Sequence, residues 1–187
     1  SQEIPPGTEE VLRALTGDGV KDHSLSLFSD SPSAASARQP WRGYWWPYKG
    51  APLYQGSSAP LRKLDEHVRI AYGISAGITH WESHNHRYDG VWWEGHCNGW
   101  AASSVLRKEP HTTFTSSSGV VFSISDQKGL LAEMDYCAKA SFYGRRNRGR
   151  PDDNVNDLTP IQFERALRYY IGNLRKPIAM DYRQDRA

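Results

Sequence analysis

The chain has 187 residues, which suits one domain with a real hydrophobic core or one large part of a bigger fold. Its formal net charge of +2 is too small to indicate a nucleic-acid partner, and no apolar run approaches the ~20 residues that cross a bilayer. Seven Trp and ten Tyr in so short a chain predict an aromatic groove or aromatic packing between subdomains.

The two cysteines, Cys97 and Cys137, are too few for a disulfide framework. We expect Cys137 to be a core residue inside a helix, with a regulatory Cys97–Cys137 disulfide as the alternative. The chain begins with Ser1 rather than Met, and we expect that an upstream segment has been removed. Secretion is therefore compatible with the sequence.

The first 40 residues predict an arm and a linker. Residues 8 to 16 are expected to form a short helix, with Thr8 as its N-cap and Gly17 as its end. Residues 30 to 40 are rich in Ser, Ala and Pro, which is typical of a linker. This part of the chain would serve as a remnant pro-segment, an appended arm or a docking element.

The next stretch, residues 41 to 54, is dense in aromatic residues, Gly and Pro and predicts an irregular packed segment. Pro60 then opens an amphipathic helix. We expect this helix to be scaffold, with an inner face formed by Leu61, Leu64, Val68 and Ala71.

Four histidines lie between residues 79 and 96, namely His80, His84, His86 and His96. His80 and His84 are spaced to share one helix face and bind a metal, with His86, His96 or Cys97 completing a tetrahedron. The spacing matches no strong zinc pattern, however, and the polar and Gly residues after His84 favour a loop. We therefore expect a solvated or substrate-facing loop, no metal and no other cofactor.

Cys97 lies at the start of a run of small residues, within the stretch from residue 95 to 106, that predicts a tightly packed helix. A cysteine at a helix N-terminus lies beside unpaired N–H groups and the positive end of the helix dipole, and both stabilise a thiolate. The same N–H groups can form part of an oxyanion hole. The pattern is typical of a nucleophile, and a small buried hydrophobic side chain is the alternative.

Residues 112 to 115 and 120 to 124 predict a β-hairpin around a turn rich in Ser and Gly. Ser125 and Asp126 are expected to cap a helix that runs to about residue 138. Asp126 therefore has a structural role to play at the start of this helix. The inner face of the helix is expected to hold Leu130, Leu131, Met134 and Cys137.

The C-terminal part predicts a polar loop over residues 144 to 156, followed by a helix and a strand. The segment Thr159-Pro160-Ile161-Gln162 is a capping box with Pro at the first helical position, so the helix should begin there and end before Pro177. Residues 178 to 182 predict the strand.

Several short blocks carry a resemblance to a known family. In chain order they are Tyr44-Trp45-Trp46-Pro47, Gly95-His96-Cys97-Asn98-Gly99-Trp100-Ala101-Ala102, Gly119-Val120-Val121-Phe122, Asp126-Gln127-Lys128-Gly129-Leu130, and Asp157-Leu158-Thr159-Pro160. In this order and spacing they resemble the transglutaminase elicitor family, the secreted acyltransferases of plant-pathogenic oomycetes with relatives in bacteria. The resemblance covers residues 41 to 187, which we expect to be a transglutaminase-like catalytic domain that lacks its C-terminal part.

The resemblance implies an α+β, papain-like cysteine protease fold, with Cys97 in a helical N-terminal subdomain and a β-rich part only begun in this chain. It implies that Cys97 attacks a glutamine carboxamide, releases ammonia and passes the acyl group to a lysine amine. The expected partners are therefore protein substrates, and secretion is expected with them. Asp126 and Asp181 are the candidates to orient a base.

Aromatic residues near the cysteine are the candidates to bind substrate, namely Trp46, Trp93 and Trp100. In papain-like enzymes the residue that completes the oxyanion hole comes from upstream of the cysteine. This implies that Trp46 or Tyr48 approaches Cys97, and a place in the core or in the wall of a cleft is the alternative.

The general base stays unassigned. Oomycete members of the family have a His after the Phe that matches Phe163, whereas this chain has Glu164. A carboxylate cannot form the imidazolium that pairs with a thiolate. The family also continues beyond Ala187, so we expect a C-terminal chain of the same precursor to supply the base.

Two other functions are open. A cysteine protease or a glutamine deamidase differs only in that water, rather than an amine, resolves the acyl-enzyme. A non-catalytic binding module is favoured by Glu164 and by the missing C-terminal part.

Overall fold

The computed structural model describes residues 33–140, 143, 158 and 160–180. It divides into two compact units, one formed by Pro40–Ala138 and the other by Ser1–Gln39 together with Lys139–Ala187. The helix expected at residues 8 to 16, the loop expected at 144 to 156, and Asp181 lie outside the described residues. The boundary expected after residue 40 stays a prediction.

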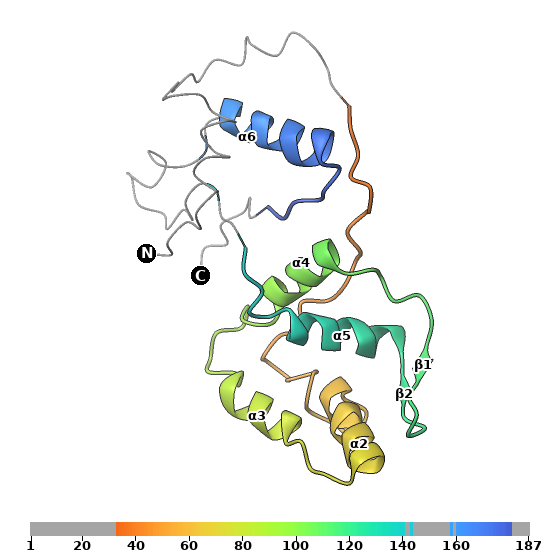
Figure 1. The fold of residues 1–187 in the computed structure, drawn as a ribbon. Coiled ribbons are helices and arrows are strands. Elements are labelled where there is room, and N and C mark those ends of the chain that lie inside the picture. The colour runs from red at the N-terminus through yellow and green to blue at the C-terminus, as the bar shows by residue number, and fades with distance from the viewer. Residues whose placement is uncertain (1–32, 141–142, 144–157, 159, 181–187) are drawn as a thin grey trace. The chain divides into compact units, whose positions relative to one another are not determined.

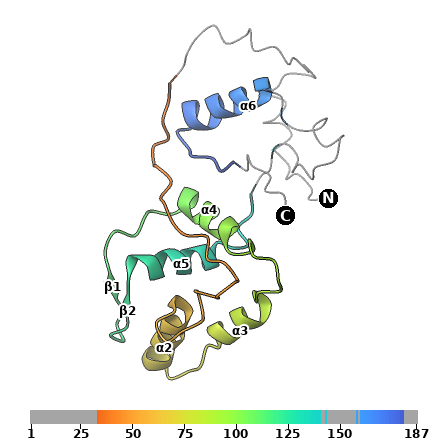
Figure 2. The ribbon, with the colours of Figure 1, turned by 180° about the vertical axis from the view of Figure 1, so that it is seen from behind.

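The unit Pro40–Ala138 is a mixed structure of four helices and one small sheet among its described residues (Figure 1). Its elements are α2 (Pro60–Tyr72), α3 (Ile78–Asn85), α4 (Cys97–Leu106), β1 (Phe114–Thr115), β2 (Val121–Phe122) and α5 (Ile124–Met134). Helices α4 and α5 lie side by side in both views, while α2 packs against α3 and α5 (Figure 2).

Helix α2 confirms the predicted amphipathic helix. Pro60 stands at its start, and Gly73 ends it in the left-handed conformation with a φ of 68°. Leu61 is fully buried, but Ala71 is exposed, so its predicted place on the inner face is wrong. The buried residues of α2 lie at its N-terminal end, and its last turn is exposed.

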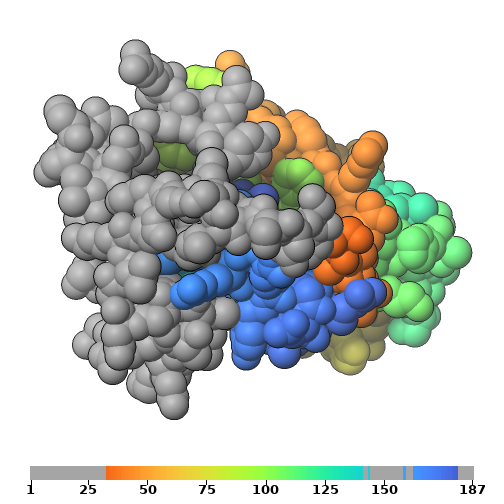
Figure 3. Space-filling view, turned by 90° about the horizontal axis from the view of Figure 1, so that it is seen from above, coloured from red at the N-terminus to blue at the C-terminus, as the bar shows by residue number. Residues whose placement is uncertain are grey.

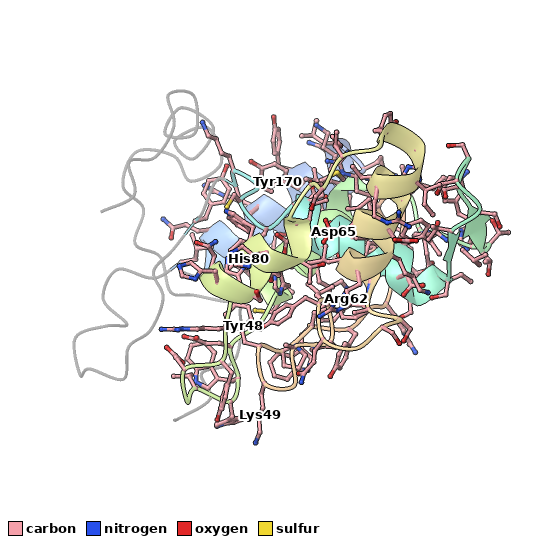
Figure 4. All side chains as sticks on the ribbon, turned by 90° about the horizontal axis from the view of Figure 1, so that it is seen from below. Tyr48, Lys49, Arg62, Asp65, His80 and Tyr170 are labelled. Carbon is pink, nitrogen blue, oxygen red and sulfur yellow. The ribbon has the colours of Figure 1, made fainter. Side chains whose placement is uncertain are left out.

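Helix α3 begins against a side chain of α2. The Asp65 carboxylate accepts hydrogen bonds from the backbone N–H groups of Ile78, at 2.9 Å, and Thr79, at 2.8 Å. These bonds satisfy donors that an N-terminal turn leaves unpaired. Figure 4 labels Asp65 and Arg62 on α2 and His80 on the neighbouring α3. The orientation of α3 is therefore set by α2.

Helices α4 and α5 approach closely because their facing residues are small. A Cβ atom on Gly99 would lie only 1.9 Å from the carbonyl oxygen of Ala132. Ser103 is fully buried, and its hydroxyl donates to the Leu131 carbonyl or to the Asp135 carboxylate, at 2.6 and 2.7 Å. Arg107 then pairs with the same carboxylate at 2.7 Å. The tight packing expected from the small residues after Cys97 is confirmed.

The β-hairpin is confirmed in a shorter form, with Phe114 opposite Phe122 and Thr115 opposite Val121. The N-cap of the next helix is Ser123, two residues before the predicted Ser125, which lies inside the helix. Asp126 stands at the third helical position and completes a capping box, because its carboxylate accepts a hydrogen bond from the Ser123 N–H. Its structural role at this helix start is confirmed, although the cap itself is Ser123.

Helix α5 ends earlier than predicted, which corrects the expectation for Cys137. The N–H of Tyr136 bonds to Glu133, three residues back, so the chain turns out of the helix after Met134. Cys137 is consequently exposed and outside the helix, not a core residue. Met134, also predicted to face inward, is exposed.

The core of this unit is a cluster formed by Trp46, Leu53, Leu61 and Ala132. Glycines let the chain pass close to the Trp46 side chain and backbone. A Cβ on Gly129 would lie 2.8 Å from the Trp46 ring, and one on Gly95 would lie 2.7 Å from the Trp46 carbonyl oxygen. These two glycines therefore fix how the segment before α2 crosses α5 and the start of α4.

In the other unit, the predicted C-terminal helix is confirmed as α6 (Pro160–Leu167), and it continues as a π-helical stretch, η3 (Arg168–Asn173). Figure 3 shows residues 160–180 in blue on the face seen from above. The Ala37 N–H bonds to the Arg175 carbonyl at 2.7 Å, and Glu164 pairs with Arg168. None of the helices in the described part of the chain is long and apolar enough to span a bilayer.

The strand predicted at residues 178 to 182 is not found over 178–180, and the rest of that stretch is outside the described residues. A strand needs a partner, and the only sheet within the described ranges consists of β1 and β2.

Replacing Gly99 by Ala is expected to destabilise the fold by about 1–3 kcal/mol, because the new methyl group has no room against Ala132. The effect appears as a lower midpoint of urea-induced unfolding. Gly172→Ala is the control, since nothing lies within 4 Å of a Cβ built there. Equal midpoints for the two variants would contradict the close contact between α4 and α5.

Candidate functional site

Cys97 is the first residue of α4, as the sequence predicts, and its side chain is exposed. The N-cap is His96, and no side chain among the described residues caps this helix end. The backbone N–H groups of the first turn are therefore left to interact with an anion at Cys97. This arrangement suits both a thiolate and the oxyanion of a tetrahedral intermediate.

The residue before Cys97 points the opposite way, into the protein. His96 is 1% exposed, and its Nε2 atom lies 2.6 Å from Glu133 Oε2 on α5 and 3.0 Å from Glu82 Oε1 on α3. Its Nδ1 atom lies 3.3 Å from the Trp46 carbonyl oxygen. Three separate segments therefore hold the residue that precedes the cysteine.

Groups of opposite charge meet in this cluster. Burial alone would lower the pKa of His96, but contacts with Glu133 and Glu82 outweigh it and raise that pKa to about 9. Burial likewise works to raise the pKa of Glu82, yet His96 and His86 hold it below its usual value. The buried carboxylate of Glu82 and the partly buried carboxylate of Glu133 thus create a place that favours positive charge.

Aromatic rings surround the cluster. The Tyr48 ring stacks on His86, with centroids 5.5 Å apart, and meets His96 edge-on at 5.4 Å. Its hydroxyl forms a 2.7 Å hydrogen bond with Tyr136, whose ring also contacts both histidines. Burial and the Tyr136 hydroxyl raise the pKa of Tyr48, so its proton is firmly held. Tyr48 is buried, so the core position considered for it is the one observed.

The three tryptophans predicted to bind substrate occupy different environments. Trp46 is 7% exposed and belongs to the core, and Trp100 is half-buried and packs against that core. Trp93 is exposed in the segment before α4. The structure thus gives Trp46 and Trp100 a packing role, and contact between Trp93 and a substrate stays a prediction.

Asp126, a candidate to orient a base, is occupied by its structural contacts. One of its oxygens accepts hydrogen bonds from the backbone and hydroxyl of Ser123, at 2.7 and 2.8 Å, and pairs with Lys63 at 2.6 Å. The other candidate, Asp181, lies outside the described residues. Assistance to Cys97 by either carboxylate stays a prediction.

The structure groups the histidines differently from the metal pattern considered in the sequence. His80 and His84 are exposed on α3, whereas Glu82 between them is fully buried. Residues two apart on a helix lie about 200° apart around its axis, so these neighbours face opposite sides. His86, four residues after Glu82, joins the buried side and pairs with it at 2.8 Å.

Sequence reasoning therefore missed Glu82 and Glu133 as partners of His86 and His96. The spacing of Glu82 and His86, four residues apart at the end of α3, was the one local signal. Glu133 comes from α5, and only the tertiary fold brings it to His96.

The chain is similar in structure, but not detectably in sequence, to a known protein. No protein-family model matches the chain, and no curated protein does. Among solved structures, the GP42 transglutaminase from Phytophthora sojae matches with a TM-score of 0.55 and 18% sequence identity, over 93% of this chain. The fold resembles that of an oomycete transglutaminase. This chain spans 57% of the length of that protein.

The two exposed thiols give a direct test of the site. At pH 6 a thiol with the ordinary pKa of about 8.5 is almost entirely protonated and reacts slowly with iodoacetamide. We expect Cys97 to be alkylated several-fold faster than Cys137, because only Cys97 lies at a helix N-terminus. Peptide mass spectrometry after timed labelling gives both rates.

Unfolding in urea is the control for this comparison, since it removes the helix and should bring the two rates together. Both thiols are exposed in the folded chain, so access alone does not separate them. Equal rates in the folded chain would contradict an activated Cys97.

Proposed function

We propose that this chain belongs to a transglutaminase-type acyltransferase in which Cys97 is the nucleophile. The observation that carries the proposal is an exposed cysteine at the uncapped start of α4, within a fold that resembles a transglutaminase. The papain-like arrangement expected from the sequence belongs to the same proposal. The substrates are proteins, one offering a glutamine side chain and the other a lysine.

The reaction has two halves, and Cys97 takes part in both. The thiolate attacks the carbonyl carbon of a glutamine carboxamide, the C–N bond breaks, and ammonia leaves with a proton from the site. The product is a thioester on Cys97. A lysine ε-amine then attacks the thioester, loses a proton and forms an isopeptide bond, which regenerates the thiol.

The N-terminus of α4 supplies the electrostatic part of this chemistry. Negative charge builds on the substrate oxygen in each tetrahedral intermediate, next to the N–H groups of the first helical turn. Because these groups belong to a helix packed tightly on α5, they stay in place as the charge develops. Removing one such donor in other acyl-transfer enzymes costs about 10²–10³ in rate.

The general base comes, in this proposal, from outside the described residues. His96, the histidine adjacent to Cys97, is turned into the buried cluster and held there by two glutamates. Glu164, which stands where the family has a histidine, pairs with Arg168. A C-terminal segment of the same precursor remains the proposed source, with Asp181 as the candidate to orient it.

We expect the full-length protein to incorporate a fluorescent primary amine into a glutamine-rich substrate protein such as casein. Cys97→Ala should reduce this incorporation by roughly 10³-fold or more, to background, because it removes the thiol that forms the thioester. Cys137→Ala is the matched control and should keep full activity, since that exposed thiol lies outside the helix.

Ammonia release measured in the same assay separates the competing functions. Release of ammonia without incorporation of the amine would show that the chain is a glutamine deamidase instead of an acyltransferase. Cleavage of the substrate protein would show that it is a protease. Full activity of Cys97→Ala would overturn Cys97 as the nucleophile and favour a non-catalytic module.

A further inference from the structure

A second potential site lies directly beneath Cys97 and is independent of acyl transfer. It consists of Glu82 on α3, His86 directly after α3, His96 directly before α4, and Glu133 on α5. One possible ligand atom from each of these residues lies within 4.8 Å of all the others. We propose that these four side chains bind a divalent transition-metal ion, with Zn²⁺ as the ion that fits best.

The cluster lacks the hydrogen bonds that would satisfy it without an ion. Nε2 of His96, Oε1 of Glu82 and Oε2 of Glu133 are buried and have no hydrogen-bond partner among the described residues. They lie at ion-pair distances of 2.6 and 3.0 Å, but no N–H is aimed along these contacts. Buried polar atoms without partners are costly, and a shared cation satisfies all three together.

The other nitrogen of His96 supports this assignment. Its Nδ1 faces the carbonyl oxygen of Trp46 at 3.3 Å, which favours keeping the proton on Nδ1, so a cation that enters between the glutamates displaces the proton of Nε2 and binds there. A histidine that binds a metal through one nitrogen typically donates its other N–H to a carbonyl in this way. The backbone of Trp46 therefore selects the tautomer that a metal requires.

The donor set and the spacing select the class of ion. Two imidazole nitrogens with two carboxylate oxygens suit Zn²⁺ and its first-row neighbours, whereas Ca²⁺ and Mg²⁺ take oxygen ligands alone. Ligands of a tetrahedral Zn²⁺ lie roughly 3.3 Å apart, from bond lengths of about 2.0–2.1 Å. The present contacts of 2.6, 2.8 and 3.0 Å would open by about 0.3–0.7 Å to reach this spacing, and the wider separations, of up to 4.8 Å, would close.

Such an ion would have a structural role. Four protein ligands leave no open position for a substrate, and Glu82 and His96 are fully buried. The side chains of His86 and Glu133 are 14% and 19% exposed, so they offer the path by which an ion enters. The ion would tie α3, the start of α4 and α5 together, one residue away from Cys97.

The test uses the full chain, stripped with a chelator and then titrated with Zn²⁺ or Co²⁺. We expect about one ion per chain, a Tm raised by several degrees, and visible Co²⁺ absorption bands typical of four-coordinate nitrogen and oxygen ligands. Glu133→Gln should weaken Zn²⁺ binding by at least about 10-fold, because it removes a charged ligand from the partly exposed side. Glu82→Gln should do the same where it folds.

His80→Ala and His84→Ala are the matched controls, since both histidines are exposed on the same helix as Glu82. They should bind Zn²⁺ as the unchanged chain does. No Tm shift with either metal, or loss of binding in these controls with retention in Glu133→Gln, would overturn the proposal in favour of a metal-free ion-pair cluster. None of these measurements depends on transferase activity.

Discussion

The burial of His96 is the constraint on which the placement of Cys97 depends. Glu82, Glu133 and the carbonyl of Trp46 converge on this one imidazole from three different segments. An unpaired charge left in the interior would cost several kcal/mol, so these segments cannot shift independently. Because the first residue of α4 follows directly, fixing His96 inward leaves Cys97 exposed at the helix N-terminus.

Close backbone contacts provide the second part of this framework. Gly95 and Gly129 pack against Trp46, and Gly99 packs against Ala132, at distances that no side chain would allow. All three glycines lie in the short sequence blocks that resemble the transglutaminase elicitor family. Gly95 and Gly99 belong to the block that contains Cys97, and Gly129 belongs to the block that begins at Asp126. Their positions follow from how closely α4 and α5 pack, and the fold that results resembles that of a solved transglutaminase.

Local signals in the sequence predicted the elements that depend on local chemistry. Pro60 predicted the start of α2, small residues after Cys97 predicted a packed helix, and the hairpin followed from its Ser- and Gly-rich turn. The exposure of Cys137 was missed, because the turn after Met134 involves Asp135, which Arg107 and Ser103 hold from another helix. The buried cluster was missed because Glu82 and Glu133 are residue types that are usually exposed, and only packing shows them buried or paired.

The central claim is that Cys97 forms a covalent acyl-enzyme, and trapping that intermediate tests it most directly. The protein would be incubated with a glutamine peptide in the absence of an amine, quenched with acid and measured by intact-mass spectrometry. The account predicts an adduct equal to the peptide minus ammonia, located on Cys97 after digestion and preserved in Cys137→Ala. An adduct on Cys137, or none under conditions where amine transfer occurs, would contradict it.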